Sequence, residues 1–423
     1  MKYRSRIIDK QIQESLKLFG AIAIEGPKWC GKTWSGGEAA KSYFYLADPS
    51  HNFYNRQLVK YDVSNAFAGD YPHLIDEWQE VPEIWDAVRH MVDQSGERGC
   101  FILTGSSTPN DNATIHSGTG RISRVQMSTM SFQELGISTH DISLGKLLAG
   151  TVNNKLVKKS SLTLDNLLGY ICKGGWPDLL EADDESSTKI LRKYVKSLVE
   201  ADCTKIDGVK RNPAKINALL QSLSRNTATL VKKQTIAKDI ASYDSLELSR
   251  NTIDSYLNVL RRLFILQEIP AWHPALKSTI RMRSLPKRIL VDQSLAVASL
   301  GCNATFLKND LKLAGNLFEN LVFHDLLIYA QANEAKVYHY HDDSDYEVDA
   351  IIESMDGSWG AIEIKLGYDG EEEGAKNLLQ LESKLDKSLQ VEAKFLAVIV
   401  GIGGILHKRE DGIWVIPLDC LGE

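Results

Sequence analysis

The sequence predicts an α/β protein with more than one domain, and three observations support this. The chain has 423 residues, which corresponds to about three domains at roughly 150 residues each. Up to about Gly136, short β-rich apolar runs alternate with helical stretches, as in a parallel sheet covered by helices. From about residue 162 the periodicity is helical, and strand-like runs return after about Gly301.

Composition excludes several classes of protein. With 43% hydrophobic and 25% charged residues, the chain is neither disordered nor fibrous. The longest nearly apolar run, Phe395 to Leu406, has 12 residues and is too short to span a bilayer, and the start MKYRSRIIDK lacks a signal-peptide layout. We therefore expect a cytoplasmic protein without membrane contact. The six cysteines show no CxxC spacing, and with a net charge of −6 any nucleic-acid contact must be local.

The first predicted strand, Ala21 to Ile24, leads into a motif for binding phosphate. The segment that follows fits the pattern GxxxxGK[ST] and comprises Gly26, Pro27, Lys28, Trp29, Cys30, Gly31, Lys32 and Thr33. Its glycines let backbone N–H groups wrap around a phosphate at the start of a helix. We expect Lys32 to reach the β- and γ-phosphates and the Thr33 hydroxyl to ligate Mg²⁺.

Further strands are expected at Tyr43 to Leu46, Leu74-Ile75 and Phe101 to Leu103. Asp76 and Glu77 follow the short run Leu74-Ile75. We expect Asp76 to hold Mg²⁺ through its water shell and Glu77 to act as the base that orients the attacking water.

Two further candidates come later in this region. Hydroxyl side chains follow Phe101 to Leu103, and we favour Ser106 over Thr104 as the group that touches the γ-phosphate and the water; a turn that satisfies its own backbone is the alternative. Arg121 follows a glycine pair and is a candidate arginine finger, a role that a neighbouring subunit often supplies; a surface arginine is the alternative.

The middle of the chain is predicted to be helical. Leu162 to Asn226 is expected to be a helical lid or connector, and Lys233 to Gln267 a helix-turn-helix followed by a strand-like run, as in a winged helix. Arg250 and Asn251 open its second helix and are candidates for contact with a DNA groove. A wholly basic stretch follows and predicts contact with nucleic-acid phosphates, or with nucleotide at a subunit seam; it comprises Lys277, Arg281, Arg283, Lys287 and Arg288. Packing of this stretch against the acidic run Glu181 to Glu185 is the alternative.

The C-terminal region is predicted to follow the order α-β-β-β-α-β. The expected elements are a helix at Lys312 to Ala330, strands at Val337 to His341, Glu347 to Glu353 and Gly360 to Lys365, a helix at Gly374 to Leu385 and a strand at Phe395 to Val400.

Four side chains of this region form a candidate metal site. A hairpin brings Asp349 and Glu363 together, and alternation places Lys365 on the face of Glu363. With Glu319 on the helix, these groups predict a second Mg²⁺ or Mn²⁺ and metal-dependent phosphodiester hydrolysis. An exposed strand is the alternative, and Glu347 competes with Asp349 for its role.

The ordered motifs GPKWCGKT, LIDEW, ILTGSS, GTGRISR and MSTMSFQELG give the chain a family likeness, and KGGWPDLL, GNLFENLV, EVDAII and IEIKLG extend it over nearly the whole length. The chain resembles the prokaryotic AAA-type ATP-binding proteins that carry an uncharacterised C-terminal domain. The resemblance implies a P-loop AAA-type ATPase, then helices with a winged helix, and a C-terminal fold similar to PD-(D/E)xK nucleases. It also implies Lys32, Thr33, Asp76, Glu77 and Arg121 as the ATPase residues, and ATP rather than GTP as the nucleotide.

We therefore expect an ATPase domain at 1–140, a helical and winged-helix part at 141–300 and a nuclease-like domain at 301–423. The first hypothesis is a Mg²⁺-dependent ATPase associated with DNA, with a metal-dependent nuclease domain. A second makes the C-terminal domain a non-catalytic protein- or DNA-binding module controlled by the ATP state, and a third is a nucleotide-dependent regulator with little turnover. A homo-oligomer in which Arg121 acts in trans is expected under the arginine-finger interpretation.

Overall fold

The computed structural model describes residues 3–108, 116–206, 208–244, 249–274, 284–385 and 393–423. It divides into two compact units. Unit 1 comprises Met1–Thr129, Glu200–Arg211 and Leu257–Ile265, and unit 2 comprises Met130–Val199, Asn212–Tyr256 and Leu266–Glu423. Within these described ranges, we find no helix with the length and apolar character needed to cross a membrane.

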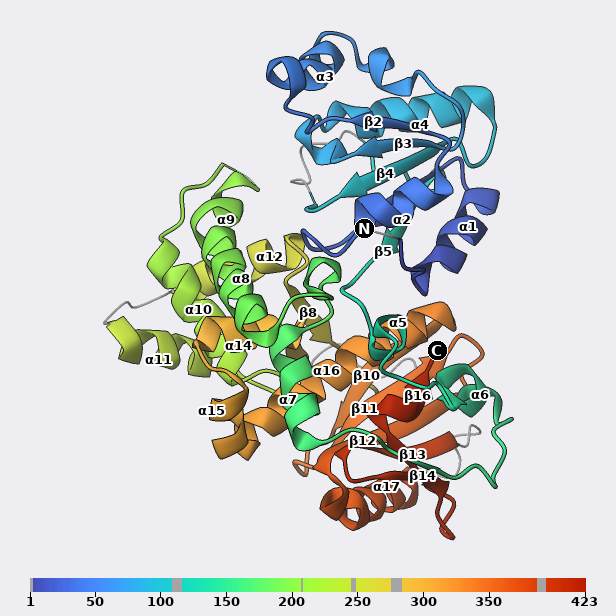
Figure 1. Cartoon of the computed structure of the whole chain (residues 1–423), viewed down its shortest axis with the longest axis vertical. Coiled ribbons are helices and arrows are strands. Elements are labelled where there is room, and N and C mark those ends of the chain that lie inside the picture. The colour runs from blue at the N-terminus through green and yellow to red at the C-terminus, as the bar shows by residue number, and fades with distance from the viewer. Residues whose placement is uncertain (1–2, 109–115, 207, 245–248, 275–283, 386–392) are drawn as a thin grey trace. The chain divides into compact units, whose positions relative to one another are not determined.

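Unit 1 is built on a parallel sheet with the strand order β2-β3-β4-β1-β5 (Figure 1). Its strands are β1 (Ala21–Glu25), β2 (Ser42–Tyr45), β3 (His73–Asp76), β4 (Phe101–Gly105) and β5 (Ile122–Gln126). The first four lie where the sequence predicts them. The fifth is not predicted, because only Ile122 and Val125 of this short strand are buried apolar residues.

Helices cover both faces of this sheet: α1 (Ile8–Leu18), α2 (Lys32–Ala39), α3 (Ser50–Tyr61) and α4 (Glu83–Ser95). Side chains alternate along a strand, so successive residues of β1 enter different cores. Ala21 and Ala23 pack in a cluster with Trp78 and Trp85, whereas Ile22 and Ile24 pack with residues of α1. Burial on both faces explains why Ala21 to Ile24 of β1 form an unbroken apolar run.

Part of unit 2 is mainly helical, and its helices include α5 (Phe132–Leu135), α6 (Leu144–Ala149), α7 (Leu164–Lys173), α8 (Asp184–Ser197), α10 (Pro213–Arg225), α14 (Gln293–Leu300) and α15 (Ala304–Asn309). A π-helical turn (Leu198–Asp202) follows α8, and the short α9 (Cys203–Lys205) after it belongs to unit 1. In the described part of 162–226 every regular element is helical, which confirms the prediction for this stretch.

The predicted helix-turn-helix region contains two helices and an antiparallel strand pair. These are α11 (Lys233–Asp244), α12 (Arg250–Arg262), β8 (Leu266–Ile269) and β9 (Lys287–Leu290). The Ser249 hydroxyl accepts a hydrogen bond from the Thr252 N–H at 3.2 Å and caps α12, as expected of a serine at this position. The C-terminal part of α12, from Leu257, belongs to unit 1. The winged-helix interpretation stays a prediction.

The second half of unit 2 is a seven-stranded sheet with the order β10-β11-β12-β13-β15-β14-β7. Its elements are α16 (Leu311–Ala332), β10 (Ala335–His341), β11 (Glu347–Ser354), β12 (Trp359–Gly367), α17 (Glu371–Lys384), β13 (Ala393–Ile402), β14 (Ile405–Lys408), β15 (Trp414–Pro417) and β7 (Lys158–Lys159). Their order from α16 to β13 is the predicted α-β-β-β-α-β. Two further short strands, β6 (Ile142–Ser143) and β16 (Leu421–Gly422), pair in parallel.

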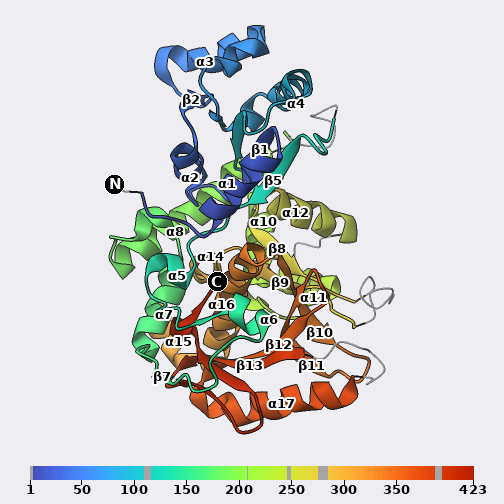
Figure 2. The same ribbon diagram turned by 90° about the vertical axis from the view of Figure 1, so that its right-hand side faces the viewer.

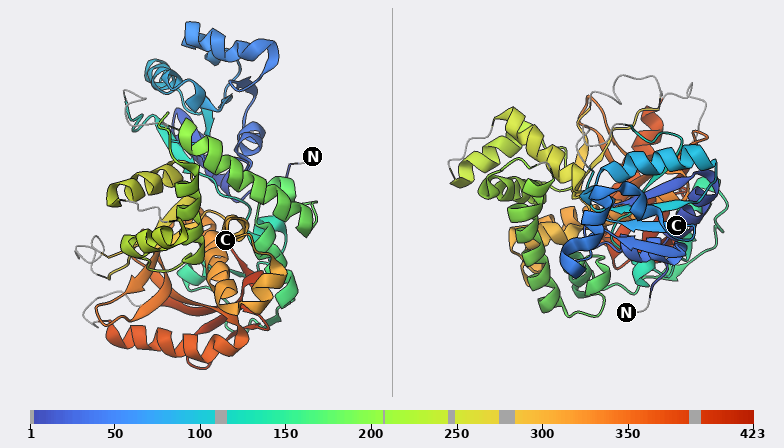
Figure 3. Two further views of the ribbon diagram at one scale, coloured as in Figure 1. Left: turned by 90° about the vertical axis from the view of Figure 1, so that its left-hand side faces the viewer. Right: turned by 90° about the horizontal axis from the view of Figure 1, so that it is seen from above.

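Helices α16 and α17 pack on opposite faces of this sheet (Figures 2 and 3). Leu378 and Leu381 of α17 pack against Val398 and Val400 of β13. A Cβ at the neighbouring position, Gly401, would lie 3.1 Å from the Phe318 ring of α16, on the other face.

The middle of α16 is fixed to β9 through Asn320, which is completely buried. Its side-chain oxygen accepts hydrogen bonds from the Leu290 N–H at 3.1 Å and the Thr227 hydroxyl at 2.7 Å, and its amide donates to the Leu290 carbonyl at 2.9 Å. Asn320 therefore pairs with the end of β9 as a neighbouring strand would, and it sets the position of Glu319 relative to Lys287.

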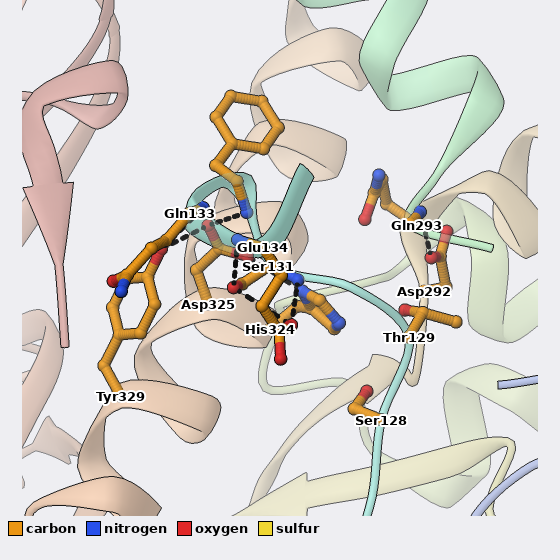
Figure 4. A network of polar contacts seen from close by, with 12 residues as sticks. Ser128, Thr129, Ser131, Gln133, Glu134, Asp292, Gln293, His324, Asp325 and Tyr329 are labelled. Carbon is orange, nitrogen blue, oxygen red and sulfur yellow. Dashed lines mark hydrogen bonds and ion pairs between the residues drawn. The ribbon is translucent and has the colours of Figure 1, made fainter. Parts of the chain in front are cut away.

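Nearer its carboxyl end, α16 caps α5 (Figure 4). The Asp325 carboxylate accepts the Phe132 N–H at 3.0 Å, and the His324 ring lies 2.9 Å from the same carboxylate. Ser131 and Glu134 complete the cap, since each accepts the other's backbone N–H. The start of unit 2 is thus held by a buried carboxylate of α16.

We expect Asn320→Leu to lower the free energy of unfolding of unit 2 by about 3 kcal/mol, because it leaves buried polar groups of Leu290 and Thr227 without partners. Native-state hydrogen exchange of the β9 and α16 amides measures this loss. Asn309→Leu, which removes one exposed hydrogen bond to Thr305, is the control and should change stability by less than about 0.5 kcal/mol. Equal effects of the two substitutions would contradict the role given to Asn320.

Candidate functional site

The loop after β1 has a backbone that only certain residues allow. Gly31 has a φ of 101° immediately before α2, a conformation that favours glycine. A Cβ at Gly26 would lie 2.1 Å from the Met127 carbonyl oxygen, so glycine is required there too. Trp29 adopts a φ of 74°, which is strained for a side chain of this size and is typical of functional loops. The loop is thus held tightly around the start of a helix.

Lys32 lies in this loop with 5% of its surface exposed. Its Nζ donates to the carbonyl oxygens of Gly26 at 3.0 Å and Pro27 at 2.8 Å. These partners are neutral, and a polyanion would offer the ammonium stronger charge-assisted hydrogen bonds. Since α2 also presents its positive end here, the loop is suited to bind an anion.

Asp76, at the end of β3, joins three elements. Its Oδ1 accepts the Thr33 hydroxyl of α2 at 2.7 Å and the Thr104 hydroxyl of β4 at 2.5 Å. Burial raises the pKa of Asp76, and the two hydroxyl hydrogen bonds oppose this rise. A carboxylate beside a hydroxyl supplies the hard oxygen ligands that Mg²⁺ prefers, so Thr33 and Asp76 fit a Mg²⁺ ion.

Glu77 follows in a left-handed conformation with a φ of 57°. Its Oε2 accepts the Ser106 hydroxyl at 2.9 Å and a further hydrogen bond from the Gln79 amide, and Gln79 also donates to the Ser106 oxygen at 3.2 Å. The two hydroxyl candidates therefore have different neighbours: Ser106 contacts Glu77, whereas Thr104 contacts Asp76. Sequence reasoning missed Gln79, because no spacing rule singles out an amide two residues after an acid.

The loop rests on a buried arginine that sequence analysis also missed. Arg6 donates through Nη1 to the Cys30 carbonyl at 2.9 Å, and through Nη2 to the carbonyls of Ser128 at 2.9 Å and Thr129 at 3.0 Å. It therefore joins the phosphate-binding loop to the segment that follows β5. On the outer side of the loop, Lys28 forms a 2.6 Å ion pair with Asp202.

Arg121 lies beside the amino ends of the parallel strands, whereas the phosphate-binding loop follows a carboxyl end. Its carbonyl accepts the N–H of Ala21, the first residue of β1, whereas the loop follows the last residue of that strand. Five residues of strand separate the two ends by about 13 Å. The Arg121 side chain is half exposed and pairs with Asp93 at 2.7 Å, which lowers the pKa of Asp93.

In unit 2, the two carboxylates predicted to bind a metal, Asp349 and Glu363, accept hydrogen bonds from other protein groups. Asp349 Oδ2 accepts the Ile364 N–H at 2.8 Å, and Glu363 Oε1 accepts the Asn377 amide at 2.8 Å. Lys365 Nζ lies 3.4 Å from Glu363 Oε2 and 3.2 Å from Glu373. Burial raises the pKa of Glu363 to about 8, and the charge of Asp349 adds to this rise.

Glu319 contacts the ammonium of Lys287 rather than an open space. Lys287 Nζ lies 2.7 Å from Glu319, 2.7 Å from Glu347 and 3.4 Å from Asp349. Burial lowers the pKa of Lys287, but the three carboxylates outweigh this effect and raise it above the ordinary value. Burial and the charge of Asp349 raise the pKa of Glu319, whereas the charge of Lys287 and its hydrogen bond lower it.

The residues of this cluster do not fit a bound metal. Lys287 takes the position between Glu319 and Asp349, and the remaining oxygens of Asp349 and Glu363 accept protein hydrogen bonds. Across the described ranges we find no group of three or more His, Cys, Asp or Glu side chains arranged to hold a metal ion.

The prediction that Lys287 and Arg288 contact nucleic acid is wrong. Their side chains are 1% and 3% exposed. Arg288 donates to Glu268 at 2.9 Å and to the Val231 carbonyl at 2.9 Å. Strand pairing of β9 with β8 buries both residues, and local composition does not reveal this. The other three residues of the basic stretch, Lys277, Arg281 and Arg283, lie outside the described residues.

The two residues predicted to contact a DNA groove, Arg250 and Asn251, lie at the start of α12. Arg250 is the first residue of α12, and Asn251, the next residue, is exposed. The structure gives Asn251 no specific role, so its contact with a DNA groove stays a prediction.

Three family models match separate parts of the chain. Residues 19–136 match an AAA domain, residues 164–305 match the domain of unknown function DUF8612, and residues 314–421 match the domain of unknown function DUF4143. The AAA match covers the whole sheet of unit 1, from before β1 to beyond β5.

Comparison of the whole chain with other proteins finds relatives of low sequence identity. The uncharacterized proteins Rv2008c of Mycobacterium tuberculosis and Mb2031c of Mycobacterium bovis are each 24% identical over 359 residues, which is 84% of this chain and 72% of the relative. Among solved structures, the Walker-type ATPase PABY2304 of Pyrococcus abyssi aligns with a TM-score of 0.42 and 11% identity, over 69% of this chain and 94% of the other. From the family match, residues 19–136 form an AAA-type P-loop domain of ATPase character.

Proposed function

We propose that the AAA domain binds ATP with Mg²⁺ and hydrolyses it. The observation that carries this proposal is the junction at Asp76, where hydroxyls from α2 and β4 meet one carboxylate beside the phosphate-binding loop. In this proposal Lys32 exchanges its two carbonyl partners for the β- and γ-phosphates. Thr33 and Asp76 hold Mg²⁺, which compensates phosphate charge when bound.

Glu77 has the role of orienting the attacking water in this proposal. Ser106 and Gln79 hold its carboxylate at Oε2, and they fix the direction in which the carboxylate points. The left-handed backbone at Glu77 turns the chain immediately after Asp76, so the two acids serve separate tasks although they are neighbours in sequence.

We expect Glu77→Gln to reduce ATP hydrolysis by about 100-fold or more while ATP binding is retained, because an amide does not take a proton from water. Single-turnover hydrolysis and binding of a fluorescent ATP analogue measure the two effects separately. Glu80→Gln changes an exposed acid three residues away that pairs with Arg56, and it is the control. Normal hydrolysis by Glu77→Gln would refute the assignment.

We propose further that Arg121 acts on the nucleotide of a neighbouring copy. Its own loop lies at the far edge of the sheet, and its surface ion pair with Asp93 is of a kind that contributes little energy and is readily exchanged. An arginine that is half exposed at the amino edge of the sheet is thus available to a second chain.

Mixing two inactive variants tests this proposal. Lys32→Ala cannot bind ATP productively and Arg121→Ala lacks the finger, so each alone should have little activity. A mixture should regain hydrolysis, because the intact Arg121 of one chain meets the intact loop of the other. Arg89→Ala, which removes the other ion-pair partner of Asp93, should leave hydrolysis unchanged. Full activity of Arg121→Ala alone would overturn the finger role.

Arg6 is expected to determine how firmly the loop holds the nucleotide. Arg6→Met removes a buried donor from three carbonyls, including that of Cys30, and should weaken ATP binding by about tenfold, since each charged hydrogen bond contributes on the order of 1.5–3 kcal/mol. Arg4→Met, an exposed change two residues away, is the control for a titration with a fluorescent nucleotide. Equal affinity of both variants would contradict this role.

For the C-terminal domain, we propose the non-catalytic alternative: a module whose contacts with a protein partner or DNA change with the ATP state. The nuclease hypothesis is supported by the approach of Asp349, Glu363 and Lys365 to one another. However, the ammonium of Lys287 lies where that chemistry needs a metal ion. Burial of Lys287 and Arg288 also removes two of the cations on which DNA binding was predicted.

A further inference from the structure

Lys287 is buried at the meeting point of three elements of unit 2. It begins β9, while Glu319 belongs to α16 and both Glu347 and Asp349 belong to β11. The Lys287 side chain is 1% exposed, and its Nζ also lies 5.6 Å from the centre of the Phe323 ring. A buried ammonium is costly unless charged partners surround it.

The partners of Lys287 match what an ammonium can bind. A lysine has three N–H donors, and carboxylates lie at 2.7, 2.7 and 3.4 Å from the nitrogen. A divalent ion that shared Glu319 and Asp349 with Lys287 would lie close to another positive charge in a buried site. Their repulsion disfavours occupation of the cluster by both cations together.

Further carboxylate oxygens of this cluster, on Asp349 and Glu363, accept hydrogen bonds from other protein groups. Asp349 uses Oδ2 to accept the Ile364 N–H, and Glu363 accepts from Asn377. A metal ion would have to displace several protein donors as well as the ammonium. The carboxylates are therefore arranged around a cation that the chain itself supplies.

We propose that Lys287 is the resident cation of this cluster and takes the place of a divalent metal ion. Replacing it with a neutral side chain of similar size leaves Glu319, Glu347 and Asp349 free to rearrange around a hard divalent ion, and the cluster then becomes a site for that ion. The intact chain holds no such ion there and does not carry out metal-dependent phosphodiester cleavage.

Titration of the nucleotide-free full chain with Mn²⁺, followed by electron paramagnetic resonance, tests this proposal. The wild-type chain should show no Mn²⁺ binding that depends on Asp349. Lys287→Met should gain a site with affinity at least about tenfold above the wild-type background, because removal of the ammonium leaves three carboxylates without their cation. Adding Glu319→Gln to Lys287→Met should abolish the gain.

Lys384→Met is the matched control. Lys384 also pairs with a carboxylate of this domain, at 2.7 Å from Asp342, but that pair lies at the surface. Its removal should create no Mn²⁺ site.

Two results would overturn the proposal. The first is a wild-type Mn²⁺ site that Asp349→Asn abolishes, or Mn²⁺-dependent DNA cleavage that the same substitution abolishes. The second is folded Lys287→Met, verified by circular dichroism, that gains no Mn²⁺ binding. If Lys287→Met does not fold, titration of the wild-type chain and of Asp349→Asn with Mn²⁺ still tests the proposal. Absence of a Mn²⁺ site that depends on Asp349 supports Lys287 as the resident cation, and presence of such a site refutes it.

Discussion

The phosphate-binding region of unit 1 depends on a single carboxylate oxygen, Asp76 Oδ1. By accepting hydroxyls from α2 and β4, it ties the start of the helix after the loop to the ends of two neighbouring strands. These ends meet at the same edge because the strands are parallel. Burial makes the charge of Asp76 costly, which its raised pKa expresses. A cation at this edge would relieve that cost, so the same feature that orders the site also favours Mg²⁺ in it.

Arg6 acts on the other side of the loop. Its guanidinium joins the carbonyl of Cys30 to the carbonyls of Ser128 and Thr129. The planar group presents its donors in fixed directions, which suits several carbonyls at once. The loop is also held near this segment by Gly26, whose lack of a side chain allows the close approach of Met127. The loop is therefore anchored to the segment after β5.

The sequence predicted the features that depend on local order and missed those that depend on distant contacts. The loop and Asp76-Glu77 were found because strand, turn and acid follow one another at short spacing, and four strands of the first sheet were located from their apolar runs. Strand β5 was missed because its buried residues are few. Arg6 could not be found because its partners lie 24 to 123 residues away. Lys287 was misinterpreted because a basic neighbourhood in sequence does not show that strand pairing buries the side chain.

At both carboxylate sites, around Asp76 and around Asp349, burial makes negative charge costly. The two sites differ in the cation that compensates this charge. At Asp76 the hydrogen-bond partners are neutral hydroxyls, and the charge of Lys32 lowers the pKa of Asp76 less than burial raises it, so a cation bound there would still be stabilised. At Asp349 the neighbour is an ammonium on a flexible stem, already in contact with two further carboxylates. A lysine ammonium is a compact point charge that can replace an ion's charge but cannot polarise a water as a metal does. Under our proposal, chemistry belongs to the first site, and the second serves to hold β9, α16 and β11 together.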